Sequence, residues 1–131
     1  MNNKGFSLVE LIIVIAIMAV LVGILAPQYL KYVKKSRVAI DITNADEIAQ
    51  AVNAAISDTQ ITDDGSITGV GGTAVSGVEN LKELPKSRVD ASYVWTVTYT
   101  VQDGVTSITL GNGASAAEIY PNAEPYQNTH K

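Results

Sequence analysis

Few residues of this chain are suited to chemistry, and one acid lies in an unexpected place. The only histidine, His130, is next to the end of the chain and there is no cysteine, so we expect no Ser-His-Asp triad, thiol nucleophile, two-His metal site or thiolate metal site. The first residues read MNNKGFSLVELIIVIAIMAVLVGILAP, and this apolar run contains Glu10. A carboxylate near the membrane interior costs about 2.5 to 3.5 kcal/mol on insertion scales. We therefore predict no enzyme, metal or cofactor, and Glu10 needs an explanation.

The apolar run is long enough to cross a membrane. Phe6 to Ala26 is a stretch of 21 residues in which only Ser7 and Glu10 are plainly polar, and a helix of that length spans roughly 31 Å, close to the thickness of a bilayer core. A cleaved secretory signal peptide fits poorly, because its apolar core usually has about 7 to 15 residues and no clear A-x-A site follows. A plain membrane anchor leaves Glu10 unexplained.

The segment Lys4-Gly5-Phe6-Ser7-Leu8-Val9-Glu10, followed by apolar residues up to Pro27, resembles the N-terminal signature of type IV prepilins and of the related pseudopilins. The resemblance covers about the first 40 residues. It implies that a prepilin peptidase cuts after Gly5 and methylates the new amino terminus on Phe6.

Such processing would give Glu10 a partner. The new amine on Phe6 is cationic, and an ion pair is strongest where water cannot compete. If the amine belongs to a neighbouring subunit, as the resemblance implies, Glu10 sets the axial register of identical helices in a filament. The expected partners are therefore further copies of this chain in a helical filament, the peptidase, the pilus assembly machinery and the membrane that holds the precursor.

Charge divides the chain into two parts. Residues 1–37 carry five basic residues and one acid, a net charge of +4 (5 − 1), and the remainder carries four basic and twelve acidic residues, a net charge of −8 (4 − 12). The acidic part predicts no direct binding to nucleic acid. The positive-inside rule would place it in the cytoplasm, whereas pilins face the opposite way, and we give the longer processing motif more weight. Tyr29 and Tyr32 lie at positions where an aromatic belt at the membrane exit is expected.

A second helical stretch should follow the membrane segment. From Gln28 to about Ser57, apolar or small residues recur at spacings of three and four and form one stripe, made of Val38, Ile42, Ala45, Ala49, Val52 and Ile56. Pro27 cannot donate a backbone hydrogen bond, and Gly23 precedes it by one turn. We therefore expect either a simple kink or a segment that melts between Gly23 and Pro27, and the sequence favours neither alternative.

The remainder predicts a small sheet. The run Tyr93–Val101 alternates apolar residues with threonine, as in a half-buried strand. Asp103-Gly104 predicts a two-residue hairpin turn that pairs Val101 with Thr106, Tyr99 with Ile108 and Val97 with Leu110. We expect a third strand from 115–120 or around 67–75, because a two-stranded hairpin is marginal.

Three further segments are given simpler predictions. Residues 58–77 read as a loop rich in glycine and small polar residues, 76–84 as a short capped helix or turn, and 121–131 as an extended or loose tail.

The predicted fold class is α+β, a long N-terminal helix packed on a small antiparallel sheet, as in the lollipop design of pilins. The expected organisation is a leader (1–5), a transmembrane and filament-core helix (6–27), an amphipathic continuation (28–57) and a sheet-bearing head (58–131). The leading hypothesis is a type IV pilus subunit, a membrane precursor that becomes part of an extracellular filament. Two alternatives stay open: a pseudopilin of a type II secretion or DNA-uptake system, and a monomeric membrane-anchored binding module.

Overall fold

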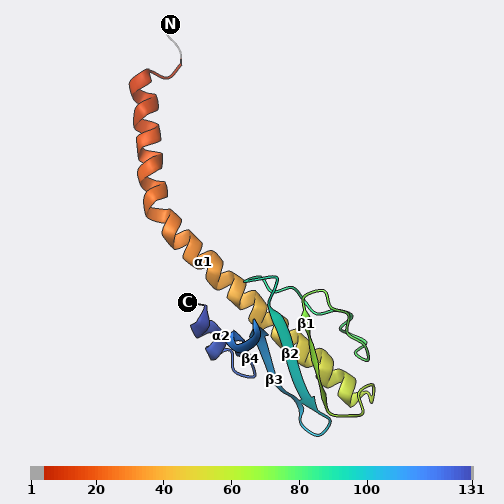
Figure 1. Ribbon diagram of the computed structural model, residues 1–131. Helices are drawn as coiled ribbons and strands as arrows, with labels where there is room; N and C mark the ends of the chain where they lie inside the picture. Colours follow the sequence, from red (N-terminus) through yellow and green to blue (C-terminus); the bar gives the residue numbers. More distant parts are fainter. Residues whose placement is uncertain (1–4, 131) are drawn as a thin grey trace. The chain divides into compact units, whose positions relative to one another are not determined.

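The computed structural model describes residues 5–130 and begins with one long helix, α1 (Leu8–Ser57). The chain divides into two compact units, residues 1–33 and 34–131; we call them the N-terminal unit and the head. Each unit is described by itself below (Figure 1). The predicted leader lies outside the described residues except for Gly5.

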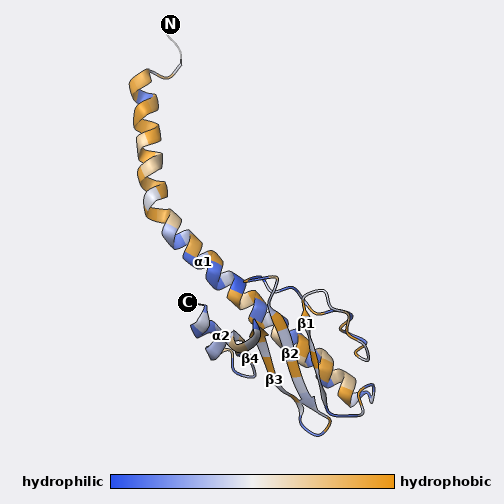
Figure 2. Ribbon diagram, viewed as in Figure 1, coloured by the Kyte–Doolittle hydropathy of each residue, from blue (hydrophilic) through white to orange (hydrophobic). Residues whose placement is uncertain are grey.

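In the N-terminal unit, α1 is almost uniformly apolar (Figure 2). Its large side chains are exposed over every face of the helix, as illustrated by Leu11 at 52% and Leu21 at 51% exposure. By length and composition α1 is the one helix among the described residues that is able to cross a membrane. An apolar helix without a covering surface in its own chain requires lipid or other helices around it.

The head contains a four-stranded antiparallel sheet in the order β1-β2-β3-β4. The strands are β1 (Gly65–Val70), β2 (Val94–Thr100), β3 (Gly104–Gly111) and β4 (Ala117–Tyr120). A 3₁₀ turn, η1 (Gly113–Ser115), precedes β4, and a short helix, α2 (Glu124–Thr129), follows it. Strands therefore form at both places where a third strand was expected. The α+β prediction of a long helix with a small antiparallel sheet is confirmed.

The register predicted for the β2–β3 hairpin is wrong by two residues. Val97 pairs with Ile108 rather than Leu110, and Trp95 pairs with Leu110. The connection consists of residues 101–103 instead of two residues, and the pairing shifts between Thr98 and Tyr99. Because side chains alternate with a period of two, a two-residue slip keeps the same apolar side chains on the buried face. The predicted division into an apolar and a threonine-rich face therefore survives.

Two segments predicted to be irregular contain regular structure. The stretch 58–77 contains β1, which pairs with β2 from Gly65 opposite Tyr99 to Val70 opposite Val94. The tail 121–131 contains α2, which is anchored by the fully buried Tyr126. The segment 76–84 forms turns and one isolated bridge, Ala74 with Glu83, without a helix.

The head core lies between the second half of α1 and one face of the sheet. The predicted stripe is confirmed at Val38, Ala45, Ala49 and Val52, which are buried, whereas Ile42 and Ile56 are half-buried. The sheet side is built by Trp95, Val97, Ile108, Leu110 and Ile119, each at most 1% exposed. The Trp95 indole N–H donates to the Pro85 carbonyl oxygen at 2.7 Å, so the largest core side chain has its polar atom satisfied.

Candidate functional site

The first candidate site lies at the start of α1, in the N-terminal unit. Phe6 is 83% exposed, and a Cβ built at Gly5 would meet no atom within 4 Å among the described residues. The Gly5–Phe6 peptide bond therefore lies in open chain just before the helix begins at Leu8. Such a bond is sterically accessible to a peptidase.

Glu10 has a partner within its own helix. The Ser7 backbone N–H donates to Glu10 Oε2 at 3.2 Å, and the Glu10 backbone N–H donates to Ser7 Oγ at 3.2 Å. This reciprocal pair is a capping box, in which the residue before the helix and the residue three positions later satisfy two amides that lack helical partners. A carboxylate in the first turn also interacts favourably with the positive end of the helix dipole.

The Ser7–Glu10 interaction was missed in the sequence, although its signal was present there. Ser7-Leu8-Val9-Glu10 has the S-x-x-E spacing of a capping box directly before an apolar run. A carboxylate with two oxygens accepts about four hydrogen bonds, so one bond to Ser7 leaves acceptor capacity for a cation. Capping and pairing with an amine are therefore compatible roles for Glu10.

Gly23 and Pro27 both lie inside α1, which continues through them. A Cβ at Gly23 would meet no atom within 4 Å, and Pro27 cannot donate a backbone hydrogen bond to the preceding turn. Melting of the helix at these residues stays a prediction.

The second candidate site is a buried carboxylate in the head. Asp41, on α1, is fully buried. Its Oδ2 accepts hydrogen bonds from Ser87 Oγ and from the Tyr126 hydroxyl, both at 2.6 Å, and its Oδ1 accepts the Arg88 backbone N–H at 2.7 Å. A buried charge of this kind is tolerated when hydrogen bonds satisfy its lone pairs. Asp41 thus joins α1, the loop 85–91 and α2.

The contacts around Tyr126 extend this cluster towards the end of the chain. Burial and the hydrogen bond to Asp41 raise the pKa of the Tyr126 hydroxyl well above its ordinary value. His130 Nδ1 lies 2.9 Å from the Tyr126 carbonyl oxygen, and His130 Nε2 lies 3.0 Å from the Tyr93 hydroxyl. The Tyr126–Asp41 hydrogen bond joins α2 to α1, and the His130–Tyr93 contact joins the residue after α2 to the residue before β2.

The sequence contained a weak signal for Asp41. It lies four residues before Ala45 and three after Val38, on the apolar stripe, where an acid is out of place. Neither Ser87 nor Tyr126 could be paired with it in advance, because they lie 46 and 85 residues away.

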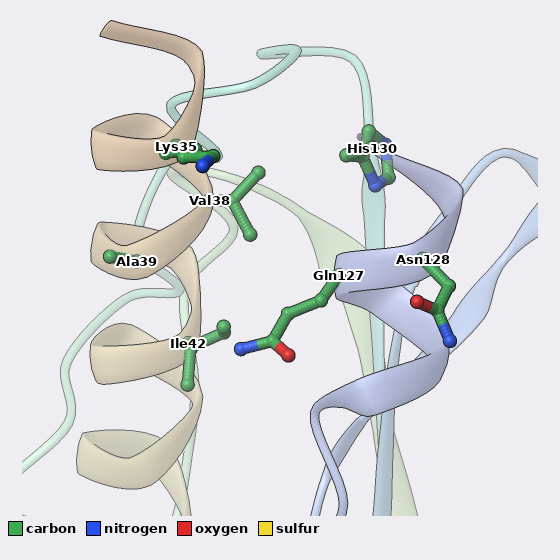
Figure 3. Close-up of a pocket in the computed structure, with 7 residues that line it drawn as sticks. All are labelled: Lys35, Val38, Ala39, Ile42, Gln127, Asn128 and His130. Atoms are coloured by element: carbon green, nitrogen blue, oxygen red, sulfur yellow. The ribbon is translucent and has the colours of Figure 1, made fainter. Parts of the chain in front are cut away.

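A shallow groove lies beside the Asp41 cluster, between α1 and α2. It is lined by Lys35, Val38, Ala39 and Ile42 from α1 and by Gln127, Asn128 and His130 from α2 and the residue after it. Val38 and Ile42 point towards α2, and the Gln127 side chain extends towards them (Figure 3). Its walls carry no arrangement of nucleophile and base. Within residues 5–130, no group of three or more His, Cys, Asp and Glu residues is placed to hold a metal ion.

The described chain combines a long apolar N-terminal helix with a small antiparallel sheet, an architecture consistent with the pilin fold. The family model described as the prokaryotic N-terminal methylation motif matches residues 1–26.

Two curated relatives from Dichelobacter nodosus extend this similarity. A type IV major fimbrial protein FimA is 36% identical over 56 residues, which cover 43% of this chain and 36% of FimA. A protein described as fimbrial protein is 29% identical over 122 residues, covering 89% of this chain and 72% of the relative. The match to FimA thus spans little more than a third of that protein. No solved structure matches the chain. The motif and these relatives support the type IV pilin family.

Proposed function

We propose that the chain is a structural subunit of a type IV pilus. It is made as a membrane precursor, cut after Gly5, methylated on the Phe6 amine and assembled through α1 into an extracellular filament. The observation that carries the proposal is Glu10, the single ionisable residue in the apolar stretch between Phe6 and Ala26. The methylation-motif match at residues 1–26 supports the processing site.

The N-terminal unit needs neighbours that its own chain does not supply. Its large apolar side chains are exposed around the whole helix, a state that lipid accommodates before assembly and identical helices accommodate afterwards. Gly23 and Pro27 would let the helix kink or loosen during this transfer. A tether for a monomeric binding module would use Glu10 only to cap its own helix and would leave the remaining acceptor capacity of the carboxylate unused, so that alternative is less well supported.

Glu10 would serve both states. In the membrane precursor its carboxylate caps its own helix through the Ser7 amide. In the filament the same carboxylate would also accept the Phe6 amine of a neighbouring subunit, an interaction favoured by low dielectric. The capping bond would thereby offset part of the insertion cost of the acid in the precursor, and the ion pair would offset more of it on assembly.

The experiment that tests this proposal is the intact mass of material sheared from the cell surface. We expect the loss of residues 1–5 and the gain of one methyl group on Phe6. Gly5→Val should leave full-length precursor in the membrane, because a branched side chain beside the scissile bond obstructs the peptidase. Gly23→Val is the matched control for adding a branched side chain away from the scissile bond, since a Cβ at either glycine meets no atom within 4 Å. Filaments that begin at Met1 would overturn the proposal.

A further inference from the structure

A cationic groove lies on the head, between α1 and the loop 85–91. Its volume is about 790 Å³ and its walls include Arg37 and Ile40 from α1 and Pro85, Lys86 and Arg88 from the loop. No acidic side chain lines the groove. Three cations thus lie together in a head whose sequence is acidic beyond residue 37.

The charges in this groove are available for a partner. Arg37, Lys86 and Arg88 are exposed, and their side chains have no hydrogen bond or ion pair within residues 5–130. The groove is also fixed in shape, because the Arg88 amide and Ser87 hydroxyl bind the buried Asp41. Cations held on an ordered loop and helix lose less freedom on binding than cations on a mobile segment.

The opposite end of the head is acidic. Asp58 follows the end of α1, Asp63 and Asp64 precede β1, and Asp103 lies in the β2–β3 connection; all four are exposed. The Val101 N–H donates to Asp64 Oδ1 at 2.7 Å, which ties the loop 58–64 to that connection. Neither segment contains a lysine or an arginine.

We infer that the cationic groove binds the acidic end of a second copy of this chain. The inference rests on the proposed filament and names a head-to-head contact within it. Charge complementarity selects the partner: the groove lacks acids, and the end formed by Asp58, Asp63, Asp64 and Asp103 lacks bases. Complementary charge of this kind fixes register and excludes wrong partners more than it adds affinity.

The positions of the two surfaces favour an open assembly. Arg37 and Ser57 are both on α1, about 30 Å apart at the rise of an α-helix, so one molecule cannot close the contact on itself. An interface between two different surfaces of identical subunits is heterologous, and repeating it builds a ring or an open helix. An open helix is the filament already proposed from the N-terminal unit.

Carbodiimide cross-linking of intact wild-type filaments tests this contact, since the reagent joins a lysine amine directly to a carboxylate. We expect peptides that join Lys86 to Asp58, Asp63, Asp64 or Asp103, identified by mass spectrometry. Lys82 is a matched control. It is exposed on the connection between β1 and β2, which also carries Lys86, but it does not line the groove. Lys86 joined only to acids elsewhere on the head, or to none, would overturn the inference.

A charge reversal with rescue tests the same contact by assembly. Arg37→Glu with Lys86→Glu should lower filament yield about tenfold or more at unchanged subunit level, whereas Lys82→Glu should not. Adding Asp58→Lys and Asp63→Lys, whose side chains make no hydrogen bond among the described residues, should restore much of the yield. Normal filaments from the double reversal would contradict the inference.

Two other outcomes separate the inference from its alternatives. If the double reversal leaves filaments intact but abolishes their retention of double-stranded DNA, the groove is a polyanion site and the inference is wrong. If wild-type cells make no filaments while processing is normal, the proposed function itself fails.

Discussion

Two acids on the same helix have contrasting surroundings. Glu10, in the N-terminal unit, has one amide partner, Ser7, three residues before it, and exposed apolar side chains around it. Asp41, in the head, is fully buried and accepts three hydrogen bonds from the loop 85–91 and α2. The head satisfies its acid within one chain, whereas the N-terminal unit leaves acceptor capacity on Glu10 for a group from outside.

This contrast indicates which unit folds alone and which one assembles. The head buries its apolar stripe and its charge, so residues 34–131 should be a soluble monomer when the N-terminal unit is removed. The N-terminal unit buries nothing of its own, so it requires lipid or other helices around it. Substitution at each acid should therefore affect a different property: assembly for Glu10 and stability for Asp41.

The largest effect is expected from Glu10→Ala, which should abolish most filaments while the subunit is inserted and processed normally. Without the acid, membrane insertion no longer carries the penalty of about 2.5 to 3.5 kcal/mol. In a helix bundle, however, an unpaired Phe6 amine costs several kcal/mol. Filament yield by electron microscopy and membrane subunit level by immunoblot measure the two outcomes. Normal filaments at normal subunit level would show that Glu10 is not a docking residue for the Phe6 amine.

Glu10→Gln sharpens this result, because glutamine keeps the shape and some hydrogen bonding but removes the charge. If Glu10 acts by pairing with an amine, the glutamine variant should lose filaments nearly as fully as the alanine variant. If it acts mainly through the Ser7 capping box, glutamine should rescue partly, since Gln also serves at this position of a capping box.

The second largest effect is expected from Asp41→Ala, measured on residues 34–131. The change leaves the Ser87 hydroxyl, the Tyr126 hydroxyl and the Arg88 amide without their acceptor, and each buried donor left unsatisfied costs about 1 to 3 kcal/mol. Urea unfolding gives the free energy of unfolding. Asp46→Ala, at an exposed acid on the same helix, is the control and should change it by less than about 0.5 kcal/mol.

The features of the fold that were predicted correctly from the sequence depend on local residue patterns. The apolar run, the stripe from Val38 to Val52 and the alternation in β2 each repeat with the period of one element, so the elements and their buried faces were readable. The hairpin register was missed because Asp103-Gly104 allows a longer connection, with residues 101–103 outside the strands. A two-residue slip leaves the pattern of faces unchanged.

What the sequence did not reveal depends on contacts between distant segments. β1 overlaps one of the two places where a third strand was expected, but its own pattern is weak, Gly65-Ser66-Ile67-Thr68-Gly69-Val70, and its pairing with β2 was not predicted. α2 is held by Tyr126, which binds an acid 85 residues earlier. The processing site proposed at Gly5 and Phe6 rests on a linear motif, which needs no tertiary structure to be recognised.

A smaller effect is expected from Tyr126→Phe, which removes one donor to Asp41 and should lower the free energy of unfolding by about 1 to 3 kcal/mol near neutral pH. The folded-state pKa of Tyr126 is raised above the ordinary 10.0, so the folded head binds this proton more tightly than the unfolded chain. Its contribution is therefore complete below pH 10 and is lost as the pH rises above that value.

Urea unfolding of residues 34–131 at neutral and alkaline pH measures this contribution. The wild-type head should lose stability above about pH 10, and the phenylalanine variant should lose less over the same interval, because it lacks the titrating group. Equal losses in the two proteins would show that Tyr126 does not determine the alkaline limit.

The smallest effect is expected from Ser7→Ala, which separates capping from pairing at Glu10. The change removes the acceptor of the Glu10 amide, while the Ser7 amide can still donate to the carboxylate. Loss of such a cap costs about 0.5 to 2 kcal/mol of helix stability, so filaments should form at within about twofold of the wild-type yield and dissociate at a lower temperature. Ser7→Thr keeps the hydroxyl and should match the wild type in both measurements. If Ser7→Ala abolishes filaments as completely as Glu10→Ala, then the acid acts by holding its own helix end, and pairing with a neighbour's amine is wrong.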